Sequence, residues 1–239
     1  FVAAFPTVDA LAAASLDAVL RAWAGLGYNR RAVHLHRAAR AIVAEHAGRV
    51  PSDPSRLEAL PGVGPYTARA VAAIAFDQPV GAVDTNVRRV LSRTAGVDPA
   101  DRAAVQALAD ALVPPDRAAD WTAALMDVGT RHCRPMPVCD GCPVSPWCAT
   151  RSARAAAPAG GPTGRARRPS PPFESTSRWL RGRIVSFLCA APPGAWVRLD
   201  RPIGTHPPEA VAVALATLAR DGLVELDPDD AAQARLATG

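Results

Sequence analysis

The chain has 239 residues, enough for one domain of ordinary size and a small second one. Hydrophobic residues make up 49% of the sequence, but none of their runs is long enough to cross a membrane, which excludes a membrane-spanning helix. The net charge of +5 favours a polyanionic partner without identifying one. All 27 basic side chains are arginines, since the sequence contains no lysine, and a Schiff base on a lysine amine is therefore excluded.

The sequence opens on Phe1, within what reads as a helix, so we expect an N-terminally incomplete chain. The sequence does not begin with an apolar leader flanked by basic residues, so we expect a cytoplasmic protein. From there to His132 the pattern is helical, without period-two alternation, so this part is predicted to be all-α. The predicted helices are Ser15–Trp23, Asn29–Gly48, a short one ending at Leu60, one beginning after Pro65, Asn86–Arg93, Asp101–Leu112 and Arg117–Gly129.

The composition changes after the first 150 residues. Residues 151–172 are rich in Ala, Pro, Gly and Arg and are predicted to form a flexible linker between domains of residues 1–150 and 173–239. The second domain should contain the helices Arg178–Ala190 and Pro208–Arg220 and a short strand Leu223–Leu226. This order resembles a small winged-helix module.

A glycine-bounded turn, Gly25-Leu26-Gly27-Tyr28, follows the first of these helices, with Arg31 close behind. A tyrosine on such a turn can wedge into a base stack while the arginine holds a phosphate. A helix-connecting loop with a half-buried tyrosine has the same pattern, and the residues alone do not decide between the two.

Two further glycines, Gly62 and Gly64, surround Val63 between two predicted helices. They predict a tight hairpin whose free amides, with those of the next helix start, donate to one phosphate oxygen. An ordinary helix–turn–helix corner is the alternative. The leucine–proline pair before the glycines and Thr67 after them favour the phosphate clamp, which holds the DNA backbone without reading bases.

Asp84 lies at the start of a predicted helix, followed by Asn86, Arg88 and Arg89. By position alone it is best interpreted as the cap of that helix. The two arginines either lie near the backbone of bound DNA or form a solvated face.

Four of the five cysteines, Cys133, Cys139, Cys142 and Cys148, fall within 16 residues, whereas Cys189 lies in an apolar helix and is predicted to be a small core residue. One compact loop with these spacings can hold a [4Fe–4S] cluster through four thiolates. Structural zinc is the alternative, but it usually uses two Cys-x2-Cys knuckles and only one occurs here. The cluster would be structural, stiffening the loop.

These features, in this order over residues 1–150, resemble the helix-hairpin-helix DNA glycosylase superfamily that includes endonuclease III and the MutY adenine glycosylases. The segments similar to MutY in particular are Phe5-Pro6-Thr7, Trp23 to Tyr28, His34-Leu35-His36 and Leu125 to Gly129. The resemblance implies an all-α fold, in which a six-helix barrel joins a helical domain with the cluster loop and DNA binds across the cleft between them.

The resemblance also implies roles for single residues. It makes Asp84 the catalytic aspartate, Asn86 an active-site asparagine and Tyr28 the residue that intercalates beside the damaged guanine. Tyr66 stands where the endonuclease III branch has a catalytic lysine, so we expect base removal without lysine-dependent strand cleavage. The family's proton donor is a glutamate expected upstream of Phe1, so residues 1–239 alone should show little activity.

The sequence thus predicts a monofunctional glycosylase that removes adenine paired with 8-oxoguanine or guanine from double-stranded DNA, as a monomer at a bacterial nucleoid. A thymine or uracil mismatch glycosylase of the same fold and a catalytically silent iron–sulfur DNA-binding protein are the alternatives. The first cysteine spacing is one residue shorter than is usual in the family. Residues 173–239 are also too short and too helical for the Nudix-like domain that reads 8-oxoguanine in many MutY proteins.

Overall fold

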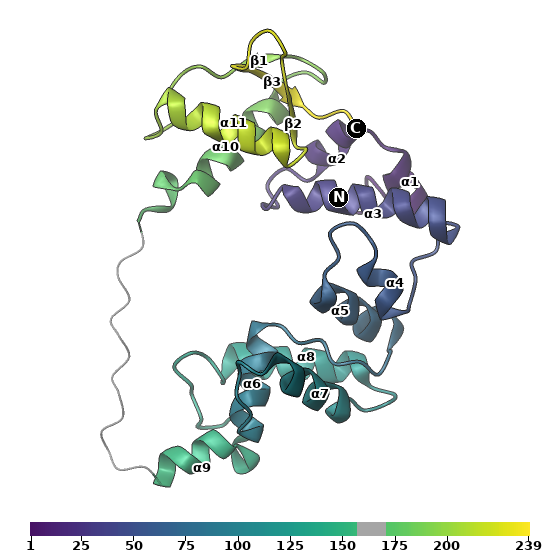
Figure 1. The fold of residues 1–239 in the computed structure, drawn as a ribbon, viewed down its shortest axis with the longest axis vertical. Helices are drawn as coiled ribbons and strands as arrows, with labels where there is room; N and C mark the ends of the chain where they lie inside the picture. Colours follow the sequence, from purple (N-terminus) through teal and green to yellow (C-terminus); the bar gives the residue numbers. More distant parts are fainter. Residues whose placement is uncertain (157–170) are drawn as a thin grey trace. The chain divides into compact units, whose positions relative to one another are not determined.

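The computed structural model describes residues 1–156 and 171–239, most of them helical (Figure 1). The α-helices are α1 (Val8–Ala13), α2 (Leu16–Ala22), α3 (Arg30–His46), α4 (Pro54–Glu58), α5 (Pro65–Phe76), α6 (Thr85–Ala95), α7 (Arg102–Leu112), α8 (Ala118–Arg131), α9 (Ala149–Ala156), α10 (Ser177–Ala190) and α11 (Pro208–Arg220). The 3-10 turns are η1 (Ser145–Trp147) and η2 (Phe173–Ser175), and the strands are β1 (Val197–Arg198), β2 (Val224–Leu226) and β3 (Gln233–Leu236). Within the described ranges, no helix is long and apolar enough to cross a membrane.

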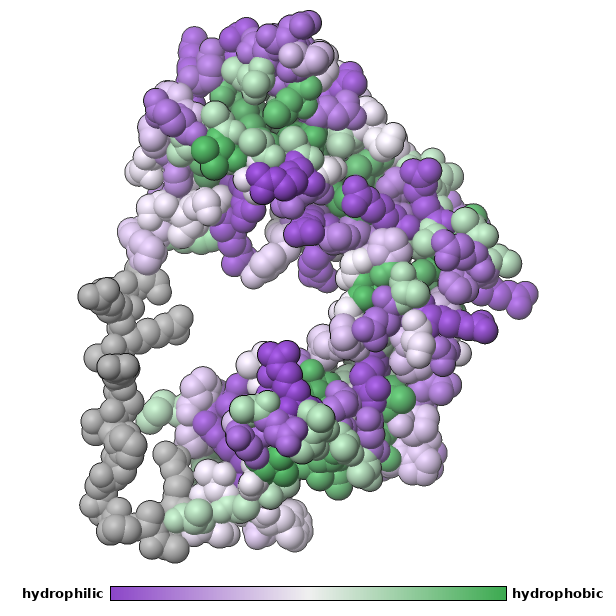
Figure 2. Space-filling model, viewed as in Figure 1, coloured by the Kyte–Doolittle hydropathy of each residue, from purple (hydrophilic) through white to green (hydrophobic). Residues whose placement is uncertain are grey.

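The described residues form two compact units. The first consists of Phe1–Val50, Leu60–Gly62 and the described residues from 171 onwards, and the second of Pro51–Ala59 and Val63 to Ala156. On the face seen in Figure 2, hydrophilic and hydrophobic residues are mixed over the surface of each unit. The apolar side chains that stabilise each unit lie in its buried core.

One hydrophobic core serves both ends of the chain in the first unit. Leu20 on α2 and Val33 on α3 are at most 1% exposed, and they belong to the same cluster as Leu180 and Ile184 on α10 and Val211 on α11. Burying such a side chain contributes about 1.5–3 kcal/mol. The helices after residue 171 therefore complete a core that the first helices begin.

Arg21 ties these two parts of the core together. Its guanidinium lies 2.7 Å from the carboxylate of Asp17 and donates to the carbonyl oxygens of Cys189, at 2.6 Å, and Ala191, at 2.8 Å. The hydrogen bond to Asp17 raises the pKa of Arg21 further above its usual range. Cys189 packs against the core, as predicted, and burial raises the pKa of its thiol.

The last part of the chain has the element order α10–β1–α11–β2–β3, which contains the two helices and the strand that the sequence predicts and adds the strands β1 and β3. Its three strands form an antiparallel sheet in the order β1-β3-β2. Val197 pairs with Ala234 and Val224 with Leu236, and Ala234 and Leu236 turn their side chains into the core.

The second unit is a cluster of helices. Val87 and Val90 on α6, Val105 on α7 and Leu125 and Val128 on α8 form its main core. A smaller apolar group joins α5 to the start of α8. Helix α6, which begins beside Asp84, is thus held on two sides.

Three sequence expectations need correction. Phe1 does not lie in a helix, because the first helix begins only at Val8, after the capping residue Thr7. Pro6 disfavours helical backbone in the residue that precedes it. Asn29 precedes α3 but makes no side-chain cap, since its own backbone is already helical. Residues 151–156 of the expected linker belong to α9, and residues 157–170 of it lie outside the described residues.

Candidate active site

The hairpin between α4 and α5 turns tightly at Gly62. The φ angle of Gly62 is +77°, and a Cβ atom there would overlap the side chain of His34. Gly64 begins α5 with extended backbone and no side-chain cap, and Pro65 fills the first helical position. No side chain therefore caps the first turn of α5, whose amide donors lie at the positive end of the helix dipole.

Gly62→Ala and Gly64→Ala separate the role of this hairpin in folding from its role in binding. At Gly62 a methyl group meets both the unfavourable φ and the overlap, so we expect a loss of about 2–4 kcal/mol in unfolding free energy. At Gly64 nothing lies within 4 Å of an added Cβ, so the loss should stay below about 1 kcal/mol while DNA binding weakens. Urea denaturation measures both variants, and equal losses would contradict this account.

Asp84 caps α6. Its Oδ1 accepts a hydrogen bond from the amide of Val87 at 2.7 Å, and its Oδ2 accepts one from the Nδ2 of Asn86 at 3.1 Å. Asp84 is thus the helix cap through its Oδ1, as its position predicts. Its Oδ2 is held by Asn86, another of the predicted site residues, and both hydrogen bonds are partly buried. Burial and the negative charge of Asp84 raise the pKa of Tyr66, so the Tyr66 hydroxyl is neutral and within electrostatic reach of the aspartate.

A polar clamp fixes the loop that leads to Asp84. The amide of Gly81 donates to Asp110 at 2.8 Å, and its carbonyl oxygen accepts from Arg69 at 2.8 Å and from Gln106 at 2.9 Å. Arg69 also pairs with Asp110. A Cβ on Gly81 would lie 2.6 Å from that of Ala109, so only glycine fits here.

A hydrogen-bonded chain connects Asp84 to the first cysteine. Asn86, which donates to Asp84, accepts at its Oδ1 from Arg89 at 2.9 Å. Arg89 also donates to the carbonyl oxygens of Gly129, at 2.9 Å, and Cys133, at 2.5 Å. Arg89 therefore points into the unit, whereas the sequence analysis expected it beside the DNA backbone or on a solvated face.

Arg89→Gln should weaken both the fold and the site, because two partly buried carbonyl oxygens and Asn86 lose their donor. We expect a loss of about 2–3 kcal/mol in unfolding free energy. Base release should also fall at least about tenfold at temperatures where the variant is still folded, since Asn86 no longer holds Asp84 in one orientation. Arg102→Gln, an exposed arginine on α7, is the control for loss of charge. Full activity of the Arg89 variant would show that the hydrogen bonds from Arg89 through Asn86 do not position Asp84.

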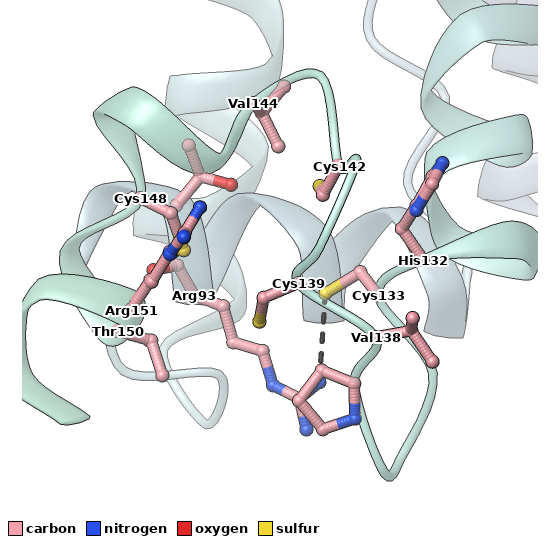
Figure 3. A pocket seen from close by; sticks show the side chains of 12 residues that line it. Arg93, His132, Cys133, Val138, Cys139, Cys142, Val144, Cys148, Thr150 and Arg151 are labelled. Carbon is pink, nitrogen blue, oxygen red and sulfur yellow. Dashed lines mark hydrogen bonds between the residues drawn. The ribbon is translucent and has the colours of Figure 1, made fainter. Parts of the chain in front are cut away.

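The four clustered cysteines line a single pocket in the cysteine loop, residues 133–148 (Figure 3). The guanidinium of Arg93 reaches into it and lies 3.6 Å from the Sγ of Cys133, and it also donates to the carbonyl oxygen of Arg134 at 2.6 Å. All four thiols are free of disulfide bonds. The loop thus gathers four soft ligands and one cation around one space.

The donor set of this pocket suits an iron–sulfur cluster. Among the described residues, no group of three His, Cys, Asp or Glu side chains stands close enough to hold a metal ion. Four thiols that line one pocket are the donors that such a cluster requires. Arg93 would offset part of the negative charge of the thiolates.

Tyr28 projects from a strained turn in the first unit. Gly25 and Gly27 have φ angles of +86° and +72°, and Tyr28 itself has one of +49°, which is uncommon for a residue with a side chain. The indole nitrogen of Trp23 donates to the carbonyl oxygen of Gly27 at 2.9 Å, and Arg31 stacks on the Trp23 ring. Trp23 therefore holds the backbone of the turn, while Tyr28 itself is 62% exposed.

The predicted site residues fall into both units. Asp84, Asn86 and Tyr66 share the second unit with the cysteine loop, together with Val63, Gly64, Thr67 and Arg88. Tyr28, Arg31 and Gly62 belong to the first unit. Sequence reasoning missed the clamp on Gly81, the inward role of Arg89 and the contact of Arg178 with Tyr28 described below.

Comparisons with known proteins identify the family of this fold. Residues 1–115 match the HhH-GPD superfamily base excision DNA repair protein family. A thermostable thymine-DNA glycosylase of known structure aligns with a TM-score of 0.60 and 30% identity over 64% of this chain and 73% of that one. Endonuclease III in a non-covalent complex with DNA aligns with a TM-score of 0.55 and 27% identity over 65% and 74%. The fold and the site therefore define a helix-hairpin-helix base excision repair protein.

Curated relatives narrow this class. The adenine DNA glycosylase of Mycolicibacterium smegmatis is 41% identical over 231 residues, covering 94% of this chain and 76% of that protein. That of Mycobacterium tuberculosis is 44% identical over 78% of this chain and 62% of its own length, and that of Homo sapiens is 45% identical over 62% and 28%. The chain belongs to the adenine DNA glycosylases of the HhH-GPD superfamily, and it spans less than two thirds of several of these relatives.

Proposed function

We propose that this protein is a monofunctional DNA glycosylase that hydrolyses the N-glycosidic bond of adenine mispaired with 8-oxoguanine or guanine. The observation that carries the proposal is the carboxylate of Asp84, held at the start of α6 by the Val87 amide and by Asn86, in a lysine-free chain of the adenine glycosylase family. Double-stranded DNA is the substrate, and the protein acts on it as a monomer.

The proposed reaction uses side chains and amides of this chain, together with a general acid that is not among the residues assigned here. The hairpin amides at Gly62 to Thr67 hold a phosphate, and the adenine is swung out of the duplex, because its glycosidic bond is unreachable inside the stack. As the bond breaks, the sugar gains oxocarbenium character, and the carboxylate of Asp84 stabilises that positive charge. The adenine leaves as the C1′–N9 bond breaks and takes up a proton from that general acid. Water then adds to the sugar carbon and gives up one proton to the solvent, so an abasic sugar and neutral adenine are the products.

Asn86 and Tyr66 prepare this carboxylate for its task. Asn86 donates to one carboxylate oxygen and fixes its direction, and Arg89 in turn fixes Asn86. Tyr66 stays neutral near Asp84, since its pKa is raised, so it adds no charge that would compete with the aspartate. With no lysine to attack the sugar, strand cleavage through a lysine imine is excluded.

We further propose that Cys133, Cys139, Cys142 and Cys148 hold a [4Fe–4S] cluster. Their convergence on one pocket beside Arg93 supports this. When bound, the cluster ties four points of the cysteine loop together and so supports the carbonyl oxygen of Cys133 to which Arg89 donates. A brown protein with iron and sulfide in equal amounts is expected, and a colourless protein with one zinc per chain would contradict the assignment.

A panel of duplexes tests the substrate. The full-length protein is incubated with duplexes containing A:8-oxoguanine, A:G, T:G or U:G, and the rates of base release are compared under single-turnover conditions. We expect release from the two adenine duplexes only. Release from the pyrimidine mismatches alone would instead identify the second candidate, which the similarity to the thymine-DNA glycosylase structure favours.

A further inference from the structure

The exposed ring of Tyr28 is covered on one face by an arginine from the C-terminal module. The guanidinium carbon of Arg178 lies 4.0 Å from the centroid of the Tyr28 ring and 5.9 Å from that of Phe173. This is a close cation–π stack. All three side chains are exposed, so residues about 150 positions apart in the sequence form one surface feature.

The position of Arg178 is rigidly determined. It lies in the first turn of α10, whose cap is Thr176, and Leu180 on the same turn is 1% exposed in the shared core. At the other end of α10, Arg21 donates to the carbonyl oxygen of Cys189. Because α10 and the Tyr28 turn are parts of one packed unit, any duplex that receives Tyr28 also meets the start of α10.

The chemistry of this contact leaves Arg178 able to bind an anion. A ring occupies only the flat face of a guanidinium, so the N–H donors along its edge remain free for a phosphate, which they can bind at two oxygens. The helix carries Arg178, Arg181 and Arg183 and no acidic residue, and Glu174 in the 3-10 turn before it is the nearest carboxylate along the chain. The start of α10 therefore carries a net positive charge, which suits a polyanion.

We propose that Arg178 is a DNA-contacting residue, which holds Tyr28 in the free protein and binds a backbone phosphate when the Tyr28 ring enters the duplex. The proposal rests on the proposed function, since it requires Tyr28 to intercalate. It assigns a role to the winged-helix-like module: the module extends the phosphate-binding surface beside the wedge. A side chain inserted between two base pairs is flanked by backbone phosphates, within reach of a cation that stacks on that side chain in the free protein and leaves it when the bases cover the ring.

The salt dependence of DNA binding tests the contact. Each phosphate neutralised by an arginine contributes about 0.9 to the slope of log K against log salt concentration. Arg178→Gln should therefore lower the slope by about one, measured by fluorescence anisotropy on an A:8-oxoguanine duplex. Arg201→Gln removes the same charge from an exposed position of the same module and should leave the slope unchanged. An unchanged slope for Arg178→Gln overturns the proposal.

A second pair of measurements separates a DNA contact from a purely structural role. In a double-mutant cycle, Arg178→Gln should weaken DNA binding less when Tyr28→Ala is already present than it does in the wild-type protein, because the two side chains act together. Additive losses would argue against the coupling. Arg178→Lys should restore the salt slope, since a lysine also neutralises a phosphate.

The proposed function and this inference can fail separately. If the wild-type protein releases adenine but Arg178→Gln leaves the salt slope unchanged, the inference alone is wrong. If the wild-type protein releases no adenine from any duplex but Arg178→Gln lowers the slope, the contact stands and the proposed function is wrong.

Discussion

Asp84→Asn should reduce adenine release by about 10³-fold while leaving the fold intact. Asparagine caps a helix about as well as aspartate, so the Val87 amide keeps its acceptor. What the substitution removes is the negative charge that stabilises the oxocarbenium-like sugar. The rate is measured under single-turnover conditions, in which product release does not limit it.

Asp101→Asn provides the matched control for this effect. Asp101 caps α7 by accepting from the amide of Ala104 at 2.9 Å, and nothing links it to the proposed chemistry. It should keep full activity and lose little stability. Equal activity of Asp84→Asn and the wild-type protein would remove Asp84 from the mechanism, even if the fold assignment is right.

Ending the chain at residue 156 should abolish cooperative folding of the first unit. The deletion removes the α10 and α11 side chains, among them Ile184 and Val211, that cover Leu20 and Val33. It also leaves Arg21 without the two carbonyl oxygens to which it donates. Each removed core side chain contributes about 1.5–3 kcal/mol, so the loss of several of them matches the usual net stability of a domain, about 5–15 kcal/mol.

A milder pair of substitutions tests the same claim without a deletion. Val211 and Val213 lie two residues apart on α11, the first fully buried and the second 68% exposed. Val211→Ala should cost about 2 kcal/mol of unfolding free energy, and Val213→Ala less than about 0.5 kcal/mol. If the two losses in urea denaturation were the same, α11 would not pack as described.

Local signals in the sequence predicted the helices well where a capping side chain is present. Ser15 caps α2 and Asp101 caps α7, and each stands at the start of the predicted helix, because each side chain accepts from an amide three residues ahead. The predicted cap at Asn29 is wrong, because the backbone of Asn29 is itself helical and its side chain makes no capping hydrogen bond. The last helix was predicted over its observed bounds, since Pro208 starts it and Asp221-Gly222 ends it.

Features that depend on distant partners were not visible in the sequence. Nothing around Arg89 indicates that its guanidinium reaches the carbonyl oxygens of Gly129 and Cys133, some forty residues away. The requirement for glycine at Gly81 comes from Ala109 on another helix. The stacking of Arg178 on Tyr28 likewise follows from the packing of α10 against the first helices. Such contacts require the three-dimensional fold, whereas motif spacing records only one segment at a time.

The two interpretations of Asp84 prove to be compatible. Position alone favours a helix cap, and the resemblance implies a catalytic carboxylate. In the structure Oδ1 accepts from the Val87 amide and caps the helix, and Oδ2 accepts from Asn86. The helix can therefore fix the carboxylate while its second oxygen still faces the proposed site. The cap thereby orients the group that the proposed mechanism uses.

The products formed from a duplex with adenine opposite 8-oxoguanine test the central claim most directly. Mass spectrometry of the reaction of the full-length protein should detect free adenine together with a full-length strand that carries an abasic site. Borohydride should trap no lysine adduct, since Tyr66 stands where a lysine nucleophile is expected and residues 1–239 contain no lysine. A strand cleaved at the lesion without alkali, or an intact adenine strand after prolonged incubation, would contradict the account.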